Sequence, residues 1–402
     1  MSFRRKLFVV ALVYVVEGFP MGVFTGVWPA FFADVGVPLA EIGFAAGLSV
    51  AWSLKVFWSP LVDRFGERRH WITGAQLALG ASLLSLSGFE GGQFAAWTVF
   101  ILASYCAASA TQDIAIDAYT IGLIDAGDEG PANAMRMTGY RVGMVGLANA
   151  LLFLPAWIGW EGALFTGALL HAAMALCTTR IPRVSVPTEA RKKLWGAMRR
   201  WLSRSGAIPV FTFVLLYRIG DSAMAPMVTP FWKYRGLTNE EIGAVSGMLG
   251  GVATLLGAWL AASVVSRLGI GRSLLWIGIV ALASNLAYAA VAALPELGRT
   301  GVYAASLTES FCAGMAGVAF MSFLMRICEK KHAAVQYALL TAIYNLAGSL
   351  LRIPSGIFTE ALGYAGYFAL TGAFALPAFA FLPKARRWLD ETPEPGNPGA
   401  GP

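Results

Sequence analysis

Long apolar blocks recur along the whole chain, and short polar or basic segments separate them. Each block has roughly the 20 residues that an α-helix needs to cross the hydrocarbon core of a bilayer. The blocks lack the two-residue alternation of barrel strands, and open strands would leave backbone groups unpaired in lipid, so helices are expected. Twelve spans are predicted, at residues 7–32, 42–61, 71–88, 95–122, 132–156, 162–179, 207–231, 241–265, 273–294, 301–326, 333–358 and 362–382.

Composition and charge agree with a membrane protein. Of the 402 residues, 57% are hydrophobic and 13% are charged, which is too apolar for an ordinary soluble domain. If the N-terminus is cytoplasmic, most of the 30 Lys and Arg fall inside, and only Lys233, Arg235 and Arg299 fall outside. We therefore predict a multi-pass protein of the cell (inner) membrane with both termini cytoplasmic. The net charge of +7 reflects this orientation, so no nucleic-acid partner is expected.

Metal and nucleotide chemistry have no pattern to support them. The four cysteines lie in or beside predicted spans without metal-ligand spacing, and we interpret them as buried small hydrophobic residues. The three histidines are scattered, and no nucleotide-binding loop is present in the sequence. No cofactor is predicted, and ATP is not expected as the energy source.

The two halves of the chain resemble each other. Five positions of the first half recur 200 positions later: Gly36, Glu41, Ile42, Gly43 and Gly47 are matched by Gly236, Glu241, Ile242, Gly243 and Gly247. Two copies of one bundle predict a substrate site between them near the bilayer midplane, with alternating access by rocking of the halves. The predicted domains are an N-terminal six-helix bundle (1–179), a cytoplasmic amphipathic linker (180–206), a C-terminal six-helix bundle (207–383) and a disordered tail (384–402).

The loop between the second and third spans carries a recognisable motif. Its sequence, Ser59-Pro-Leu-Val-Asp-Arg-Phe-Gly-Glu-Arg-Arg69, resembles the signature loop of the major facilitator superfamily. More narrowly, dispersed motifs look like those of the AmpG muropeptide permeases. These motifs are Lys55-Val-Phe-Trp-Ser-Pro60, Gln112-Asp-Ile-Ala-Ile-Asp117, Gly139-Tyr-Arg-Val-Gly143, Leu216-Tyr-Arg-Ile-Gly-Asp221, Glu309-Ser-Phe-Cys-Ala-Gly314 and Gln336-Tyr-Ala-Leu-Leu340.

This resemblance runs from about residue 15 to 380 and implies both a fold and a function. The implied fold is all-α, with 12 transmembrane helices in two pseudo-symmetric six-helix bundles. The implied function is proton-driven import of anhydro-muropeptides, with the small-molecule substrate and the lipid bilayer as partners and a monomer expected. Relatives that share several of the motifs include siderophore importers and acetyl-CoA transporters, so these cargoes stay open, as does export.

Four charged residues are predicted near the bilayer midplane. At 1.5 Å per residue, Glu17 lies roughly 15 Å into the first span, Arg218 roughly 16 Å into the seventh, and Asp221 and Glu309 at similar depth. Three carboxylates against one cation are costly in a low-dielectric site, so one carboxyl should hold a proton. We predict proton coupling by Glu17, Asp221 and Glu309, and binding of a cargo carboxylate by Arg218. The alternatives are a local Arg218–Asp221 pair and a neutral Glu309 in helix packing.

A second group of charges is predicted nearer the cytoplasm. Asp113 and Asp117 share one helical face, and Arg141 or Lys55 is placed to neutralise them. Pairs that form in one access state and break in the other would make an inner gate, although packing, direct cargo binding or proton binding remain alternatives. The predicted gate residues are Lys55, Asp63, Arg64, Asp113, Asp117, Arg136 and Arg141.

Aromatic and amide side chains at similar depth are candidates for lining a sugar-sized cavity. The predicted substrate-binding residues, besides Arg218, are Tyr14, Tyr217, Asn285, Tyr344 and Asn345; Gln76 is a further candidate. We also expect Pro20 to kink the first span beside Glu17 and to open backbone groups towards the cavity.

Other classes of protein are less well supported. Asp113 and Asp117 are spaced like an acid–base pair, but no histidine or metal ligand accompanies them, so the chain is not predicted to be an enzyme. A non-transporting membrane receptor or assembly factor on the same fold is a further alternative, which measured substrate flux would exclude.

Overall fold

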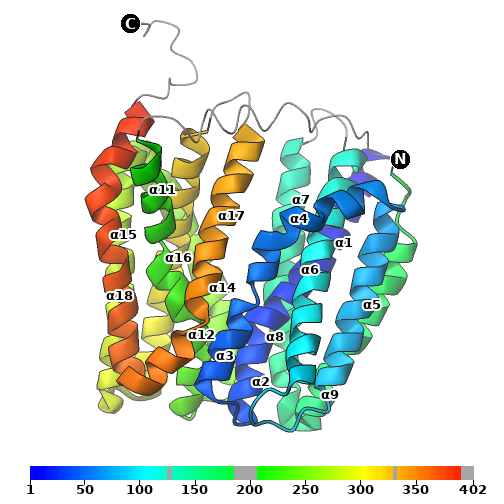
Figure 1. Ribbon diagram of the computed structural model, residues 1–402, viewed down its shortest axis with the longest axis horizontal. Coiled ribbons are helices and arrows are strands. Elements are labelled where there is room, and N and C mark those ends of the chain that lie inside the picture. Colours follow the sequence, from blue (N-terminus) through cyan, green and yellow to red (C-terminus); the bar gives the residue numbers. More distant parts are fainter. Residues whose placement is uncertain (125–128, 185–205, 329–332, 391–402) are drawn as a thin grey trace, which may run out of the picture. The chain divides into compact units, whose positions relative to one another are not determined.

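The computed structural model describes residues 1–124, 129–184, 206–328 and 333–390 (Figure 1). Within these residues the fold is all-helical and contains no strand. The predicted linker helix and the end of the predicted tail lie outside the described residues.

Helices cover each span predicted in the first half. They are α1 (Phe3–Gly22), the π-helix η1 (Val23–Val27), α2 (Trp28–Asp34), α3 (Leu39–Gly47), α4 (Val50–Arg64), α5 (Arg68–Leu86), α6 (Ala96–Leu123), α7 (Glu129–Arg141), the π-helix η2 (Val142–Leu147), α8 (Ala148–Ala150), the 3₁₀-helix η3 (Leu151–Phe153) and α9 (Pro155–Thr179).

Helices also cover the spans predicted in the second half. They are α11 (Ala207–Leu216), α12 (Ile219–Tyr234), α13 (Asn239–Glu241), the π-helix η4 (Ile242–Leu249), α14 (Gly250–Leu268), α15 (Ile270–Ala293), the 3₁₀-helix η5 (Pro295–Leu297), α16 (Gly298–Arg326), α17 (Ala333–Arg352) and α18 (Ser355–Asp390). The last helix therefore continues to Asp390, beyond the predicted start of the disordered tail at residue 384. Among the described residues, eight helical segments are long and apolar enough to cross a membrane.

The residues of the internal repeat form matching helix boundaries. Gly36 follows α2 with φ of 74°, and Gly236 follows α12 with φ of 73°. Glycine adopts this left-handed conformation without the steric cost that a Cβ imposes, so it ends both helices. Glu241 then closes a capping box with Thr238 at the start of α13.

The chain forms two compact units. Unit 1 comprises residues 1–189, 226–248 and 352–360, and unit 2 comprises residues 190–225, 249–351 and 361–402. Unit 1 thus contains α1 to α9 together with short segments from the second half of the chain. The predicted domain boundaries remain a prediction.

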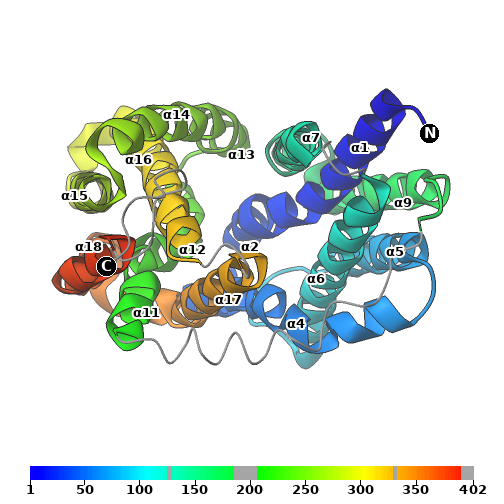
Figure 2. The ribbon, with the colours of Figure 1, turned by 90° about the horizontal axis from the view of Figure 1, so that it is seen from above.

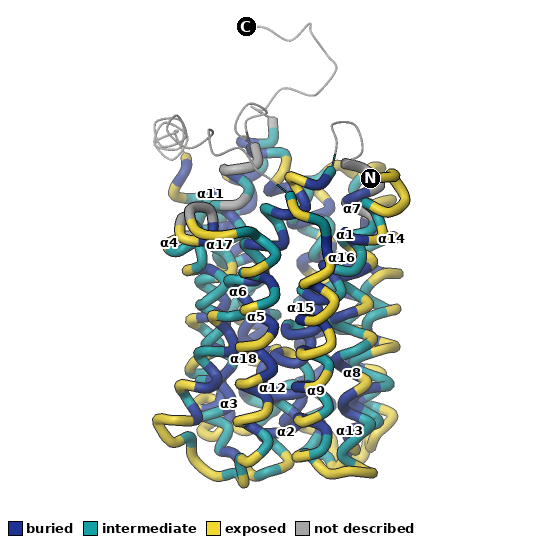
Figure 3. Tube along the Cα trace, turned by 90° about the vertical axis from the view of Figure 1, so that its right-hand side faces the viewer, coloured by how far each residue is buried: buried dark blue, intermediate teal, exposed yellow. Residues whose placement is uncertain are grey.

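Helices within each unit approach closely where glycine replaces a larger residue. In unit 1, a Cβ at Gly139 of α7 would overlap the carbonyl of Ala11 in α1. In unit 2, a Cβ at Gly314 of α16 would overlap the carbonyl of Thr254 in α14. Close backbone approach of this kind is typical of helix packing in membranes. The helices bury the faces that they turn towards one another, and exposed positions follow the outer faces and the connections (Figure 3).

Candidate functional site

Helix α6 brings side chains from three other helices onto its paired carboxylates. Asp113 Oδ2 lies 3.4 Å from Nζ of Lys55 on α4. Asp117 Oδ1 lies 2.9 Å from Nη2 of Arg136 on α7 and accepts a 2.7 Å hydrogen bond from the hydroxyl of Tyr14 on α1. The Arg136 guanidinium also lies 4.7 Å from the Tyr14 ring centroid. Tyr14, predicted to bind substrate, is therefore held by two of the predicted gate residues.

Glu17 joins this group of charges. Its electrostatic neighbours are Asp113, Asp117, Lys55 and Arg136, and its buried Oε2 atom has no hydrogen-bond partner among the described residues. We call Glu17, Lys55, Asp113, Asp117 and Arg136 the unit 1 cluster. It contains three carboxyl groups and two cations, so one carboxyl lacks a compensating charge.

The expected grouping of Glu17 with Arg218, Asp221 and Glu309 near the midplane stays a prediction, because Glu17 belongs to unit 1 and the other three residues belong to unit 2. Depth along a span orders residues along the membrane normal, but it does not tell which neighbouring helix a side chain faces. Glu17 on α1 faces the α6 carboxylates within unit 1, whereas the other three residues belong to unit 2.

Pro20 shapes α1 directly beside Glu17. Because proline has no backbone N–H, the Val16 carbonyl four residues earlier loses its helical donor. The side chains of Gln112 and Gln76 donate to that carbonyl instead, at 2.9 and 3.3 Å. The freed backbone group therefore faces buried amides, and not a cavity as we expected from the Pro20 kink.

The two glutamines belong to a fully buried polar network. Gln76 donates to Gln112 Oε1, and its own Oε1 lies 2.6 Å from Nδ1 of His171 on α9. All three side chains are completely buried, and the Phe19 ring packs 4.9 Å from the imidazole. Gln76 is thus a core residue, and the expectation that it lines a cavity is wrong.

A second group of charges lies in unit 2. Arg218 occupies the break between α11 and α12, and its Nε lies 3.4 Å from Asp221 Oδ2. Asn285 on α15 donates to Asp221 Oδ1 at 3.4 Å. Glu309 on α16 has Asp221 and Arg218 as its charged neighbours. We call these four residues the unit 2 cluster; it contains two carboxyl groups and one cation.

The remaining predicted substrate-binding residues are placed differently from one another. Tyr217 is buried, donates to the Leu274 carbonyl at 2.8 Å and stacks on the Phe320 ring. The Tyr344 hydroxyl lies 3.3 Å from Ser222 Oγ, one residue beyond Asp221. Asn345 is exposed. Tyr344 and Tyr217 therefore both adjoin the unit 2 cluster, Tyr217 as the residue that directly precedes Arg218.

Three predicted gate residues have no described ion pair. We expected Arg141 to be able to neutralise Asp113 or Asp117. Within the described part of the chain it forms no ion pair with either carboxylate, and Asp117 is instead paired with Arg136. The side chains of Asp63 and Arg64 lie outside the described residues.

Sequence reasoning missed a group of contacts centred on Asp34 at the end of α2. Asp34 Oδ1 lies 2.8 Å from Nζ of Lys233. Asp34 Oδ2 accepts hydrogen bonds from Asn239 at 2.8 Å and from the Trp160 indole at 2.9 Å. We call these four residues the Asp34 clasp, which joins α2 to α12, α13 and α9 within unit 1. The sequence offered one indication of this contact. Lys233 is one of only three cations on the predicted outer side, so a carboxylate partner for it could have been sought there.

The described residues contain no group of histidine, cysteine or acidic side chains able to hold a metal ion. Cys106, Cys312 and Cys328 are buried and Cys177 is exposed, so three of the four fit the interpretation as small core residues.

Apolar helices of membrane-spanning length, with charged residues paired inside each unit, define a multi-pass membrane protein. The family model of the Major Facilitator Superfamily matches residues 10–351, and the chain belongs to that family of transporters. The fold agrees. A bacterial homologue of the human lysosomal transporter Spinster, in an inward-facing and unoccupied conformation, aligns with a TM-score of 0.75 at 15% identity, over 98% of this chain and 100% of that one. The nucleoside transporter NupG gives 0.75 at 15% identity, over 96% and 99%.

Sequence comparison narrows the similarity. The chain is 29% identical to the anhydromuropeptide permease of Escherichia coli (strain K12) over 387 residues, which are 94% of this chain and 79% of that protein. It is 27% identical to the putative transporter AmpG 4 of Rickettsia conorii, over 94% of this chain and 95% of that protein. These similarities agree with the AmpG resemblance of the motifs and with a transporter that is not an enzyme.

Proposed function

We propose that the chain is a proton-coupled secondary transporter that imports an anhydro-muropeptide or a similar anionic, sugar-containing solute. The observation that carries the proposal is that each unit holds a cluster of charges with one more carboxyl than cations. An uncompensated charge inside a membrane protein is costly, and it marks ion and proton pathways more often than packing.

The excess carboxyl in each cluster is the proposed proton carrier. A proton bound from one side of the membrane neutralises the excess carboxylate. The cluster then costs less free energy to enclose when the carrier changes access through a closed, water-poor state. Glu17 is the candidate in unit 1, because Lys55 and Arg136 contact the other two carboxylates. Glu309 is the candidate in unit 2, because Arg218 contacts Asp221.

Arg218 is the proposed contact for a carboxylate of the cargo. Its ion pair with Asp221 uses Nε, which leaves the two terminal nitrogens of the guanidinium for a bidentate contact. Asn285 and Tyr344 lie at the same cluster and supply hydrogen-bonding groups for a sugar or peptide. The similarity to the E. coli anhydromuropeptide permease supports this cargo over siderophores and CoA esters.

The architecture that we propose follows from the predicted topology. Twelve helices cross the inner membrane with both termini in the cytoplasm, and the protein works as a monomer. The unit 1 cluster, with Asp63, Arg64 and Arg141, forms part of an inner gate that changes between access states.

Uptake into liposomes tests the proposal. The purified chain is reconstituted, and uptake of labelled anhydro-muropeptide is measured with and without an inward proton gradient. Glu17→Gln and Glu309→Gln are compared with Glu161→Gln, a matched change at an exposed position of α9. We expect gradient-driven uptake in the wild type and in Glu161→Gln. We expect at least one of the other two variants to lose its dependence on the gradient.

The possible outcomes test the identity of the cargo and the proton coupling separately. Uptake of a siderophore or a CoA ester, with no uptake of anhydro-muropeptide, would contradict the proposed cargo and leave the proposed carrier mechanism standing. Gradient dependence that survives in both Glu→Gln variants would remove the proton role from both clusters. An absence of flux for every solute from a folded protein would favour a receptor or assembly factor.

A further inference from the structure

Gln112 is the first residue of the motif that ends at Asp117, and it is the one polar residue of that motif to which the proposed transport mechanism assigns no part. Asp113 and Asp117 belong to the unit 1 cluster, whereas the Gln112 side chain contacts α1 and α5. Helix α6 packs against both of these helices, and α5 packs against α9 (Figure 2). The amide of Gln112 therefore lies where α1, α5 and α6 meet within unit 1.

The hydrogen bonds of the buried network all run towards one backbone atom. The Val16 carbonyl can only accept, so the amide nitrogens of Gln112 and Gln76 donate to it, at 2.9 and 3.3 Å. Gln76 also donates to Gln112 Oε1, and its own oxygen accepts from Nδ1 of His171. The other imidazole nitrogen is buried and has no hydrogen-bond partner among the described residues. The network is therefore suited to holding the carbonyl in place.

The Val16 carbonyl belongs to the peptide unit that also contains the Glu17 nitrogen. Because a peptide unit is planar, the Val16 oxygen, the Glu17 nitrogen and the Glu17 Cα keep a fixed relative geometry. Donors from α5 and α6 fix the orientation of that plane, since Pro20 cannot supply the usual helical donor. Glu17 Oε2 has no hydrogen-bond partner among the described residues. The position of the Glu17 carboxyl therefore depends strongly on its backbone.

A small displacement of Glu17 would change its electrostatic surroundings. The titratable groups that interact with its carboxyl come from four helices: Lys55 of α4, Asp113 and Asp117 of α6, Arg136 and Tyr140 of α7, and Tyr14 of α1 itself. These groups carry both signs of charge. Because Coulomb interactions vary with distance and are strong in a low-dielectric interior, the place that Glu17 occupies among them affects how readily it binds a proton.

We propose that Gln112, supported by Gln76 and His171, is a positioning residue for Glu17. It holds the peptide unit between Val16 and Glu17, so that the Glu17 carboxyl keeps one place among the charges of the unit 1 cluster. None of the three supporting side chains gains or loses a proton in this role. The inference rests on the proposed function, in which Glu17 carries a proton, and deepens it.

Infrared spectroscopy of the full chain in liposomes tests the proposal without measuring transport. The carbonyl stretching band of the protonated Glu17 carboxyl is identified by its loss in Glu17→Gln, and its frequency and pH midpoint are recorded. Gln112→Met keeps a side chain of similar length and removes its hydrogen bonds. We expect the frequency to change and the midpoint to move by about half a pH unit or more. Gln76→Met removes the longer of the two bonds to Val16 and should cause a smaller change in the same direction.

Restoring a donor to the Val16 carbonyl distinguishes positioning from a general disturbance of packing. Pro20→Ala in the Gln112→Met background supplies a backbone N–H four residues after Val16. We expect this double variant to recover the wild-type frequency and midpoint of the Glu17 band.

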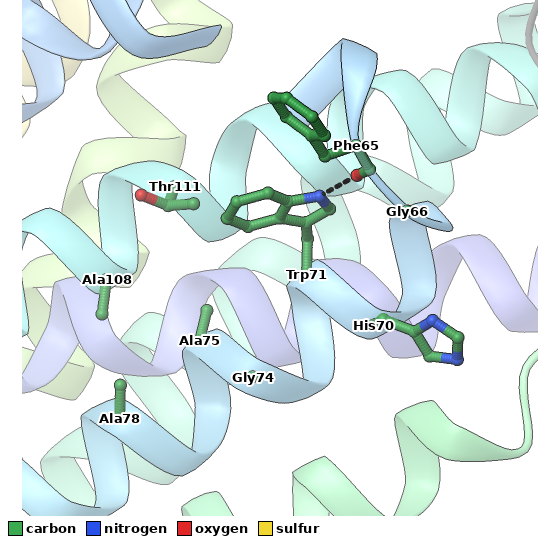
Figure 4. Close-up of a pocket in the computed structure, with 9 residues that line it drawn as sticks. All are labelled: Phe65, Gly66, His70, Trp71, Gly74, Ala75, Ala78, Ala108 and Thr111. Carbon is green, nitrogen blue, oxygen red and sulfur yellow. Dashed lines mark hydrogen bonds between the residues drawn. The ribbon is translucent and has the colours of Figure 1, made fainter. Parts of the chain in front are cut away.

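The matched control lies on the other face of α5. Ala78 is exposed and, two residues after Gln76, points to a different side of the helix. It lines a recess of about 490 Å³ together with Gly74 and Trp71 (Figure 4), so the longer side chain of Ala78→Met has space there. We expect the Glu17 band of this variant to match that of the wild type.

Failure of the inference and failure of the proposed function give different results. An unchanged Glu17 band in Gln112→Met and Gln76→Met would overturn the positioning role, and so would a change that Pro20→Ala does not reverse or that Ala78→Met reproduces. If Glu17→Gln keeps gradient-driven uptake, the proposed proton role of Glu17 is wrong, while the infrared comparison still decides whether Gln112 positions this carboxyl.

Discussion

The two charge clusters are built in different ways. In unit 1, side chains from α1, α4 and α7 converge on two carboxylates of α6, so the pairs connect four helices. In unit 2, the ion pair joins Arg218 and Asp221, three residues apart at the break before α12. Each cluster has one carboxyl in excess. The described ion pairs of the first cluster connect different helices, whereas the ion pair of the second is local and the hydrogen bond from Asn285 on α15 to Asp221 links its helices.

This difference distinguishes charged residues that also stabilise helix packing from charged residues whose main contribution is to transport. Pairs between helices contribute to packing as well as to function, and breaking them leaves a buried charge behind. A pair within one turn contributes little to the arrangement of helices. We therefore expect changes in unit 1 to affect stability strongly, and changes at Arg218 to affect transport with little effect on stability.

The largest effect is expected for Lys55→Met. Asp113 then loses its cation while its side chain stays 13% exposed, and removal of one partner of a buried pair costs about 3 kcal/mol in unfolding free energy. Thermal unfolding of the purified protein in detergent measures the loss. Asp113→Asn added to Lys55→Met should recover part of it.

The matched control is Arg136→Met. Its pair with Asp117 is 37% and 44% exposed, so a loss of at most about 1 kcal/mol is expected. Equal losses for Lys55→Met and Arg136→Met would show that burial does not determine the contribution of these pairs.

An intermediate effect is expected for Gln112→Leu. The change removes one donor to the Val16 carbonyl and the acceptor for Gln76, which should cost about 2 kcal/mol because buried polar groups are left unpaired. Thermal unfolding again measures it, with the exposed Gln93→Leu as control. Pro20→Ala in the Gln112→Leu background supplies the missing backbone N–H and should restore stability in part. A Gln112→Leu protein as stable as the wild type would show that the network does not support unit 1.

The smallest effect on stability is expected for Arg218→Lys. Lysine keeps the charge and the contact with Asp221, so unfolding should change by less than about 0.5 kcal/mol. It lacks the planar fork, so KM for an anionic cargo should rise about tenfold. Uptake kinetics in liposomes measure KM, and Arg299→Lys serves as control. A large loss of stability with an unchanged KM would contradict the view that Arg218 contributes to transport more than to stability.

Much of the fold could be predicted from the sequence because bilayer length repeats so regularly along it. The helices of each predicted span, and the helix-ending glycines at 36 and 236, follow from local pattern and backbone sterics. The count of twelve spans stays a prediction, since eight helices in the described part of the chain are long and apolar enough to cross a membrane.

The candidate site was harder to predict, because its residues meet through tertiary packing. Charge and spacing identified Lys55, Asp113 and Asp117, and an i, i+3 spacing identified Arg218 with Asp221. Nothing in the sequence showed that Glu17 faces α6, or that Lys233 meets Asp34. Those contacts join residues more than 90 positions apart, beyond the reach of helical periodicity.

The Asp34 clasp has a consequence for the conformational equilibrium of the carrier. Its ion pair and two hydrogen bonds exist only while α2 stays against α12, α13 and α9. Every interaction of this kind lowers the free energy of the arrangement in which it forms, and about 1.4 kcal/mol multiplies the population of that arrangement tenfold. Contacts outside both charge clusters therefore weight the arrangement described here against any other in which α2 has moved away from these helices.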